Sequence, residues 1–98
     1  MRTMLRVSFP VEQSNKAIKD GSLPKLMGKM MEQLKPEAAY FFPDKGRRSA
    51  LFVFDLKDTS HLPVIVEPFF EALHAEVKVT PVMNADDLKA GLEKVMKG

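Results

Sequence analysis

The chain contains no cysteine, and it has no long apolar run. Without cysteine it forms no disulfide, has no thiolate nucleophile and offers no sulfur ligand for zinc. Arg2 and Arg6 interrupt the first apolar residues too early for a signal peptide, and no apolar segment approaches the length of a membrane span. Glycine-rich phosphate loops, serine nucleophile elbows and clusters of metal ligands are also absent. We therefore expect a cytoplasmic protein with no membrane partner, no metal and no cofactor.

The chain also has little excess charge of either sign, because it contains 15 Lys and Arg and 13 Asp and Glu, for a net charge of +2. Proteins that bind nucleic acids concentrate basic residues on one face. The tightest basic cluster here is Lys45, Arg47 and Arg48, which we interpret as the solvated tip of a hairpin. An RNA-recognition domain would need aromatics where Ala50 and Asp55 stand on the third predicted strand. We expect no nucleic-acid partner.

The length of 98 residues suits a single domain spanning residues 1–98. A chain of this size buries roughly 65% of the surface that its unfolded form exposes, so its core is small. Hydrophobic residues make up 45% of the chain and charged residues 29%, which is an ordinary globular composition. Association with a second copy would add to this small core.

Alternating and helical apolar patterns predict seven elements. The predicted strands are residues 4–9, 38–42, 49–56 and 76–81, and the predicted helices are residues 11–34, residues 62–73 and a last helix capped by Asn84. Gly21 should break the first helix in a left-handed conformation, with Ser22 capping its second part. Gly46 suits a positive φ in the hairpin between the second and third strands. Pro68 should kink or divide the second helix.

The order of these elements predicts an α+β, ferredoxin-like βαββαβ fold with an extra C-terminal helix and an antiparallel four-stranded sheet. Two helices would cover one face of the sheet. Six residues would face these helices: Leu5, Val7, Leu51, Val53, Val77 and Val79. The open face would then carry Arg6, Ser8, Tyr40, Phe42, Phe52, Phe54, Lys78 and Thr80.

The third strand is apolar on both faces, and such a strand is normally covered on both sides. One helical layer covers only one side. An exposed apolar patch of this kind usually marks an interface or a binding groove. We therefore expect a homodimer that packs sheet face against sheet face, buries Phe52 and Phe54, and encloses a cavity beside the polar residues.

Four segments of the chain resemble the dimeric α+β barrel superfamily of ferredoxin-like proteins, in particular its small uncharacterised bacterial members. They are Ser8-Phe9-Pro10, Gly46-Arg47, Phe54-Asp55 and Val79-Thr80-Pro81-Val82. The resemblance covers nearly the whole chain and implies a homodimer with a cavity between sheet and helices. The superfamily includes monooxygenases, haem-binding enzymes, isomerases and ligand-sensing domains, so membership assigns no function. Its haem-degrading members use a tryptophan, which this chain lacks.

Arg6 is the main candidate for a binding residue, because a guanidinium in a covered sheet face must find a partner. An ion pair with Glu76 or a bond to a backbone carbonyl is the simpler outcome. The other outcome is an anionic ligand flanked by Tyr40 and Phe52. His61 follows the third strand near Asp55, where an imidazole could serve as an acid or base, although an exposed histidine at a helix cap is the simpler interpretation.

Two functions stay open at this point. The first is a homodimer whose cavity binds a small organic ligand, anionic if Arg6 contacts it, through Arg6, Ser8, Tyr40, Phe52 and Phe54. The second is a cofactor-independent enzyme of the monooxygenase or isomerase type that uses the same cavity, with His61 or Tyr40 carrying the proton. The sequence identifies neither the ligand nor a reaction.

Overall fold

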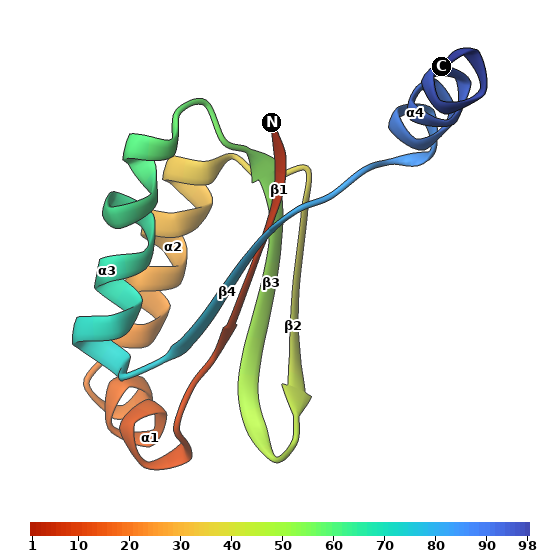
Figure 1. Cartoon of the computed structure of the whole chain (residues 1–98). Helices are drawn as coiled ribbons and strands as arrows, with labels where there is room; N and C mark the ends of the chain where they lie inside the picture. Colours follow the sequence, from red (N-terminus) through yellow and green to blue (C-terminus); the bar gives the residue numbers. More distant parts are fainter.

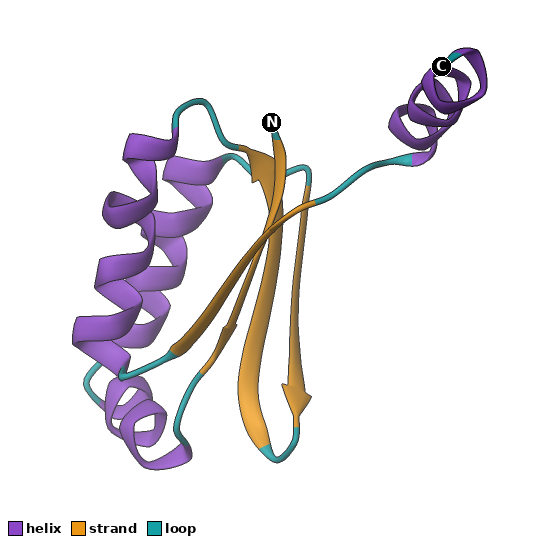
Figure 2. Ribbon diagram, viewed as in Figure 1, coloured by secondary structure: helices purple, strands orange, loops and turns teal.

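A computed structural model describes all of residues 1–98 as an α+β fold with a four-stranded antiparallel sheet (Figures 1 and 2). In chain order the elements are β1 (Arg2–Ser8), α1 (Val11–Lys19), α2 (Ser22–Leu34), β2 (Ala38–Asp44), β3 (Arg47–Asp55), the 3-10 helix η1 (Thr59–His61), α3 (Leu62–Leu73), β4 (Glu76–Pro81) and α4 (Ala85–Lys97). The strand order β2-β3-β1-β4 fits a ferredoxin-like arrangement. The predicted α+β class and the antiparallel four-stranded sheet are thereby confirmed. None of the helices has both the length and the apolar character needed to cross a bilayer.

The first helical segment breaks where the sequence predicts. Gly21 has a φ of 82°, in the left-handed region that glycine reaches without steric cost. The capping role predicted for Ser22 is wrong, because the N-cap residue of α2 is Gly21 and the Ser22 hydroxyl donates back to the Ala17 carbonyl. Instead, Asp20 Oδ1 accepts the Ser22 N–H at 2.8 Å, so the carboxylate one residue before the glycine satisfies the start of α2.

The hairpin between β2 and β3 turns through Lys45 and Gly46, whose φ angles are 53° and 76°. Two successive residues with positive φ are what a type I′ turn requires, and this turn matches the natural twist of paired strands. The predicted positive φ at Gly46 is confirmed. This tight turn keeps the charged ends of β2 and β3 close together.

Pro68 lies inside α3 without dividing it. The helix runs unbroken because its buried face continues on both sides of the proline, through Ile65 before it and Phe69 after it. Packing against the sheet therefore offsets the backbone hydrogen bond that proline removes.

The core lies between the sheet and the helix layer formed by α2 and α3 (Figure 1). In the pairing of β1 with β3, Leu5 stands opposite Phe52, and residues directly opposite each other share one face. Phe52 is 0% exposed and Phe54 is 2% exposed, so both rings lie in this core. The prediction that Phe52 and Phe54 face outward is wrong, as is the prediction that Leu51 and Val53 face the helices.

The physical reason is that β3 is apolar at every position from Ala50 to Phe54. A period of two residues predicts which side chains share a face, but in such a strand it does not say which face meets the helices. Pairing with β1 decides this, because β1 has one apolar and one polar face. The bulkier phenyl rings then fill the space beneath the helices.

The helix α4 lies apart from the other helices, beyond the end of the strands and on the side of the sheet away from α2 and α3 (Figure 1). None of its residues is buried. The radius of gyration is 15.7 Å, whereas a compact chain of this length has one of about 12.5 Å. The projecting helix accounts for this elongated shape.

Candidate functional site

The open face of the sheet can be described as rows of side chains that run across the four strands. One row is Tyr40, Leu51, Arg6 and Lys78, and the next row toward the hairpin is Phe42, Ser49, Ser8 and Glu76. A third row on the other side joins Ala38, Val53, Met4 and Thr80. The β2–β3 half of this face is therefore mostly apolar, and the β1–β4 half is mostly polar.

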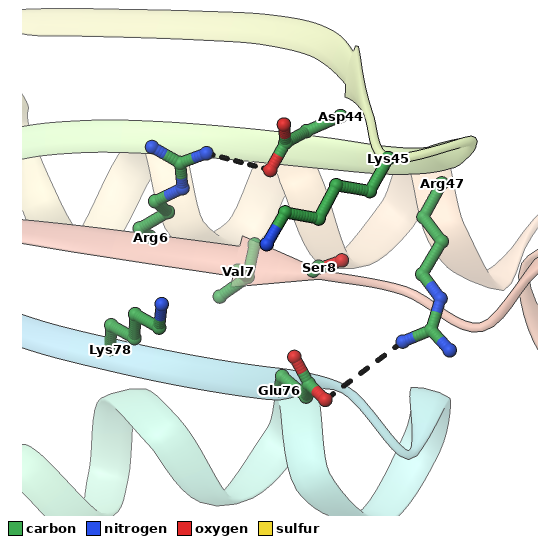
Figure 3. Close-up of a pocket in the computed structure, with 8 residues that line it drawn as sticks. All are labelled: Arg6, Val7, Ser8, Asp44, Lys45, Arg47, Glu76 and Lys78. Carbon is green, nitrogen blue, oxygen red and sulfur yellow. Dashed lines mark hydrogen bonds and ion pairs between the residues drawn. The ribbon is translucent and has the colours of Figure 1, made fainter.

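A hollow of about 560 Å³ lies at the hairpin end of this face. Figure 3 shows its lining residues, which come from β1, β4 and the hairpin: Arg6, Val7, Ser8, Asp44, Lys45, Arg47, Glu76 and Lys78. We call it the hairpin-end hollow. Four of these residues are cationic and two are carboxylates, which leaves a formal charge of +2 from four positive and two negative groups.

Two ion pairs cross the hairpin-end hollow. Arg6 Nη2 donates to Asp44 Oδ2 at 2.8 Å, and Arg47 Nη1 lies 3.9 Å from Glu76 Oε1. Neither Lys45 nor Lys78 has a carboxylate within ion-pair distance. The excess positive charge of the hollow thus resides on two ammonium groups.

Arg6 forms an ion pair, as expected, but its partner is Asp44 and not Glu76. The arginine side chain leans toward the hairpin, and its guanidinium carbon lies 5.4 Å from the centre of the Phe42 ring. A guanidinium at this distance from a ring is attracted by the ring's negative face. Glu76 stands one row further along, beside Ser8, and is turned to Arg47.

The three basic residues of the hairpin are exposed, as predicted, but they do not lie on one face, because consecutive residues of a strand point to opposite faces. Arg47 lines the hollow on the open face. Arg48 turns to the helix side, where its Nη1 donates to Ser14 Oγ at 2.8 Å and to Asn15 Oδ1 at 2.9 Å. Lys45 extends back over the sheet toward β1 (Figure 3). The strand period was a signal that could have separated Arg47 from Arg48.

Only part of the predicted binding set comes together. Arg6 and Ser8 line the hairpin-end hollow, whereas Tyr40 lies on the same face but outside it and is 62% exposed. Phe52 and Phe54 belong to the core on the other face. The sequence reasoning missed the lining contributed by Lys45, Arg47 and Asp44, because their approach to β1 depends on the hairpin geometry.

His61 lies in a different place. It lines a separate hollow of about 280 Å³ beside Leu34, Asp55 and Ile65. Asp55, which the sequence places near His61, pairs instead with Lys57 Nζ and with the N-terminal amine, each at 2.6 Å. The hydrogen bond from Lys57, followed by that from the amine, lowers the pKa of Asp55 to about 2. This carboxylate is therefore ionised at neutral pH.

The segment that carries His61 is ordered by Asp58. The Asp58 Oδ1 accepts the Ser60 N–H at 3.0 Å, and this backbone hydrogen bond lowers the pKa of Asp58. The bond is a normal cap at the start of η1. Asp58 thus has a structural role at this end of the molecule.

Chemically, the hairpin-end hollow offers a dense set of hydrogen-bond donors and positive charge. No three His, Asp or Glu side chains converge in the way that a metal ion would require. No protein-family model, curated protein or solved structure matches the chain.

Proposed function

We propose that the chain forms a homodimer through the open face of its sheet, and that the hairpin-end hollow binds a small organic anion between the subunits. The observation that carries this proposal is the charge of the hollow. It contains four cations against two carboxylates, and Lys45 and Lys78 have no carboxylate partner. Unpaired cations that converge on a concave surface favour an anionic ligand.

The donors suit a carboxylate or a phosphate group. Only the Nη2 of Arg6 is engaged with Asp44, so its remaining N–H groups are free to bind oxygen. The two ammonium groups and the Ser8 hydroxyl would add further donors from β1, β4 and the hairpin. The volume of about 560 Å³ lies within the range of roughly 300–1,000 Å³ that is usual for small-molecule sites.

The apolar half of the open face supports the dimer. Met4, Leu51, Val53 and Phe42 are only partly buried in the single chain, and they form a continuous patch beside the hollow. A second sheet packed at about 10 Å would remove this patch from water. It would also lower the dielectric around the cations and so strengthen their attraction for an anion. The dimeric α+β barrel architecture that the sequence resembles has the same sheet-to-sheet contact.

No observation favours the enzymatic alternative to the same degree. His61 lines a hollow other than the one that contains Arg6, and its expected partner Asp55 is engaged by Lys57 and the amine. Tyr40 lies on the open face without a hydrogen-bond partner that would activate it. We therefore propose binding, and not catalysis, as the function of the hollow.

Isothermal titration of the wild-type protein with citrate, and separately with inorganic phosphate, tests the binding site. We expect saturable binding that weakens about tenfold in Lys78→Ala, since a hydrogen bond to a charged group contributes roughly 1.5–3 kcal/mol. Arg6→Ala should weaken it further, because this change also leaves the Asp44 carboxylate without its partner beside the anion.

Lys29→Ala is the matched control, since it removes the same charge from an exposed position on α2. It should bind the anion like the wild type at matched ionic strength. Equal weakening in Lys29→Ala and Lys78→Ala, or no saturable binding of either anion, would contradict the proposed site.

A further inference from the structure

The helix α4 carries an apolar stripe that the rest of the chain leaves largely exposed. Leu88, Leu92 and Val95 recur at i, i+4 and i+7, so they lie on one face of the helix. They are 47%, 52% and 75% exposed, and Met96 beside them is 87% exposed. A stripe of this kind is normally the face by which a helix packs onto another surface.

The helix α4 would be only marginally stable in isolation. It has 13 residues, and isolated helices shorter than about 12–15 residues are marginal in water. Its capping box between Asn84 and Asp87 and the acidic residues of its first turn each contribute only about 1 kcal/mol. A helix in this position is stabilised mainly by burying its apolar stripe against another surface.

The base of α4 fixes the direction in which it projects. Arg2 forms ion pairs with Asp87 and with Glu37, and the Val82 N–H donates to the Arg2 carbonyl at 3.1 Å. These contacts attach the start of α4 to the first residue of β1. From there the helix points away from its own α2 and α3, on the side of the open sheet face (Figure 1).

The size of the exposed surfaces indicates what covers the stripe. An open face of four strands of about seven residues measures roughly 20 by 23 Å, or about 450 Å². A helix of 13 residues offers one side of about 20 by 10 Å, or about 200 Å². Each chain would bury three areas: the open face, its own helix side and about 200 Å² beneath the partner's helix. Together these areas reach about 850 Å² per chain, close to the roughly 800 Å² of a standard interface.

From these observations we infer that α4 is an arm that packs its Leu88–Leu92–Val95 stripe against a second copy of the chain. In a two-fold symmetric dimer each chain packs its α4 against the other chain, so the same contact forms twice. The inference rests on the homodimer of the proposed function, but not on the anion site. It explains why a short amphipathic helix lies outside the compact body of its own chain.

The double variant Leu88→Lys/Leu92→Lys in the full chain tests the arm. Sedimentation velocity over a range of concentrations should show a dimer dissociation constant at least about thirtyfold higher than in the wild type, because two apolar side chains on each arm lose their burial. Ala90→Lys is the matched control, since Ala90 is exposed on the opposite side of α4. It should change the dissociation constant less than twofold.

A cross-linking measurement reports the contact directly. Because the chain has no cysteine, Leu92→Cys and Ala90→Cys each carry one site for a benzophenone maleimide. Irradiation should give a covalent dimer from the Leu92→Cys protein and much less from the Ala90→Cys protein. Cross-links only within one chain would mean that α4 folds onto its own sheet, and would overturn the inference.

The outcomes separate the arm from the proposed function. If Leu51→Asp dissociates the dimer and the α4 double variant does not, the arm is wrong and the open-face dimer stands. If the double variant dissociates the dimer while citrate and phosphate fail to bind, the arm stands and the anion site is wrong. A wild-type protein that is monomeric at all concentrations would overturn both the arm and the dimer.

Discussion

The two faces of the sheet differ in what covers them. The face toward the helices buries Leu5, Val7, Phe52 and Phe54 almost completely. The open face carries partly buried Leu51 and Val53 beside Arg6 and the hairpin-end hollow. Neighbouring apolar residues of β3 therefore lie in different environments, because Phe52 is buried beneath the helices and Leu51 is only partly buried on the open face. The covered face forms the core of the single chain, and the open face leaves apolar side chains only partly buried.

This difference can be tested most strongly at Phe52. Phe52→Ala removes a completely buried ring, and truncations of this kind cost about 3–5 kcal/mol. Since a domain of this size is stable by about 5–15 kcal/mol, the midpoint of thermal unfolding should fall by roughly 15–30 °C. Circular dichroism at a range of temperatures measures this midpoint.

Phe41→Ala is the control for that substitution. The Phe41 ring contacts Phe52 edge-on, with centroids 5.9 Å apart, but it is 58% exposed. Its removal should cost about 1 kcal/mol, the contribution of one edge-to-face aromatic pair. Equal destabilisation by the two substitutions would mean that Phe52 is not the better buried ring and that the facing of β3 is wrong.

A second prediction addresses the open face. Leu51→Asp should leave the single chain folded, because the side chain is only partly buried there, but it should raise the dimer dissociation constant at least about a hundredfold. The reason is that a dimer would bury a carboxylate at this position, where the neighbouring Arg6 is already paired with Asp44. Sedimentation equilibrium, together with circular dichroism, distinguishes a folded monomer from an unfolded chain.

Val64→Asp provides the comparison for this change, because Val64 is exposed on α3, away from the open face. It should sediment like the wild type. A Leu51→Asp protein that remains fully dimeric would contradict the sheet-to-sheet contact, whereas one that unfolds would show that Leu51 belongs to the core.

The smallest expected effect concerns the ion pairs at the end of β3. The pKa of Asp55 is lowered to about 2 in the folded chain, mainly by the hydrogen bond from Lys57. A carboxyl group with a depressed pKa stabilises the fold above its unfolded pKa of 3.8, and this contribution is lost as the pH falls toward 2. Asp55→Asn should therefore lower the unfolding midpoint slightly at pH 6 and much less at pH 2, where the carboxyl group of the folded chain is already partly protonated.

The unfolding midpoints of the wild type and of Asp55→Asn should therefore converge as the pH falls. Both partners of Asp55 are exposed, so solvent screens the pairs and the difference at pH 6 should be only a few degrees. Adding 0.5 M NaCl should reduce it further. A difference between the two proteins that is as large at pH 2 as at pH 6 would mean that Asp55 stabilises the fold by something other than its charge.

Much of the fold could be predicted from local patterns. Leu5 and Val7 lie on the face that the sequence predicts, because β1 has one apolar and one polar side and its orientation has a single low-energy solution. The turn at Gly46 and the cap at Asn84 were predictable because each depends on neighbouring residues alone.

The candidate site was predictable only in part. Arg6 and Ser8 follow from the strand period, because they stand on the polar side of β1. The choice of Asp44 over Glu76 as the partner of Arg6 was not predictable, since it depends on the direction in which one long side chain leans across the paired strands. The same holds for Lys45, which reaches the hollow only because a tight turn directs it back over the sheet.

The four strands, the helical segments and the charged half of the open face follow from the sequence, because they depend on spacing and on neighbouring residues. Tertiary structure alone decided which side of β3 meets the helices, because both sides are equally apolar and only pairing with β1 distinguishes them. It also decided that α4 lies outside the body of the chain. An amphipathic stripe in the sequence predicts that a helix packs against another surface, but it does not predict which surface.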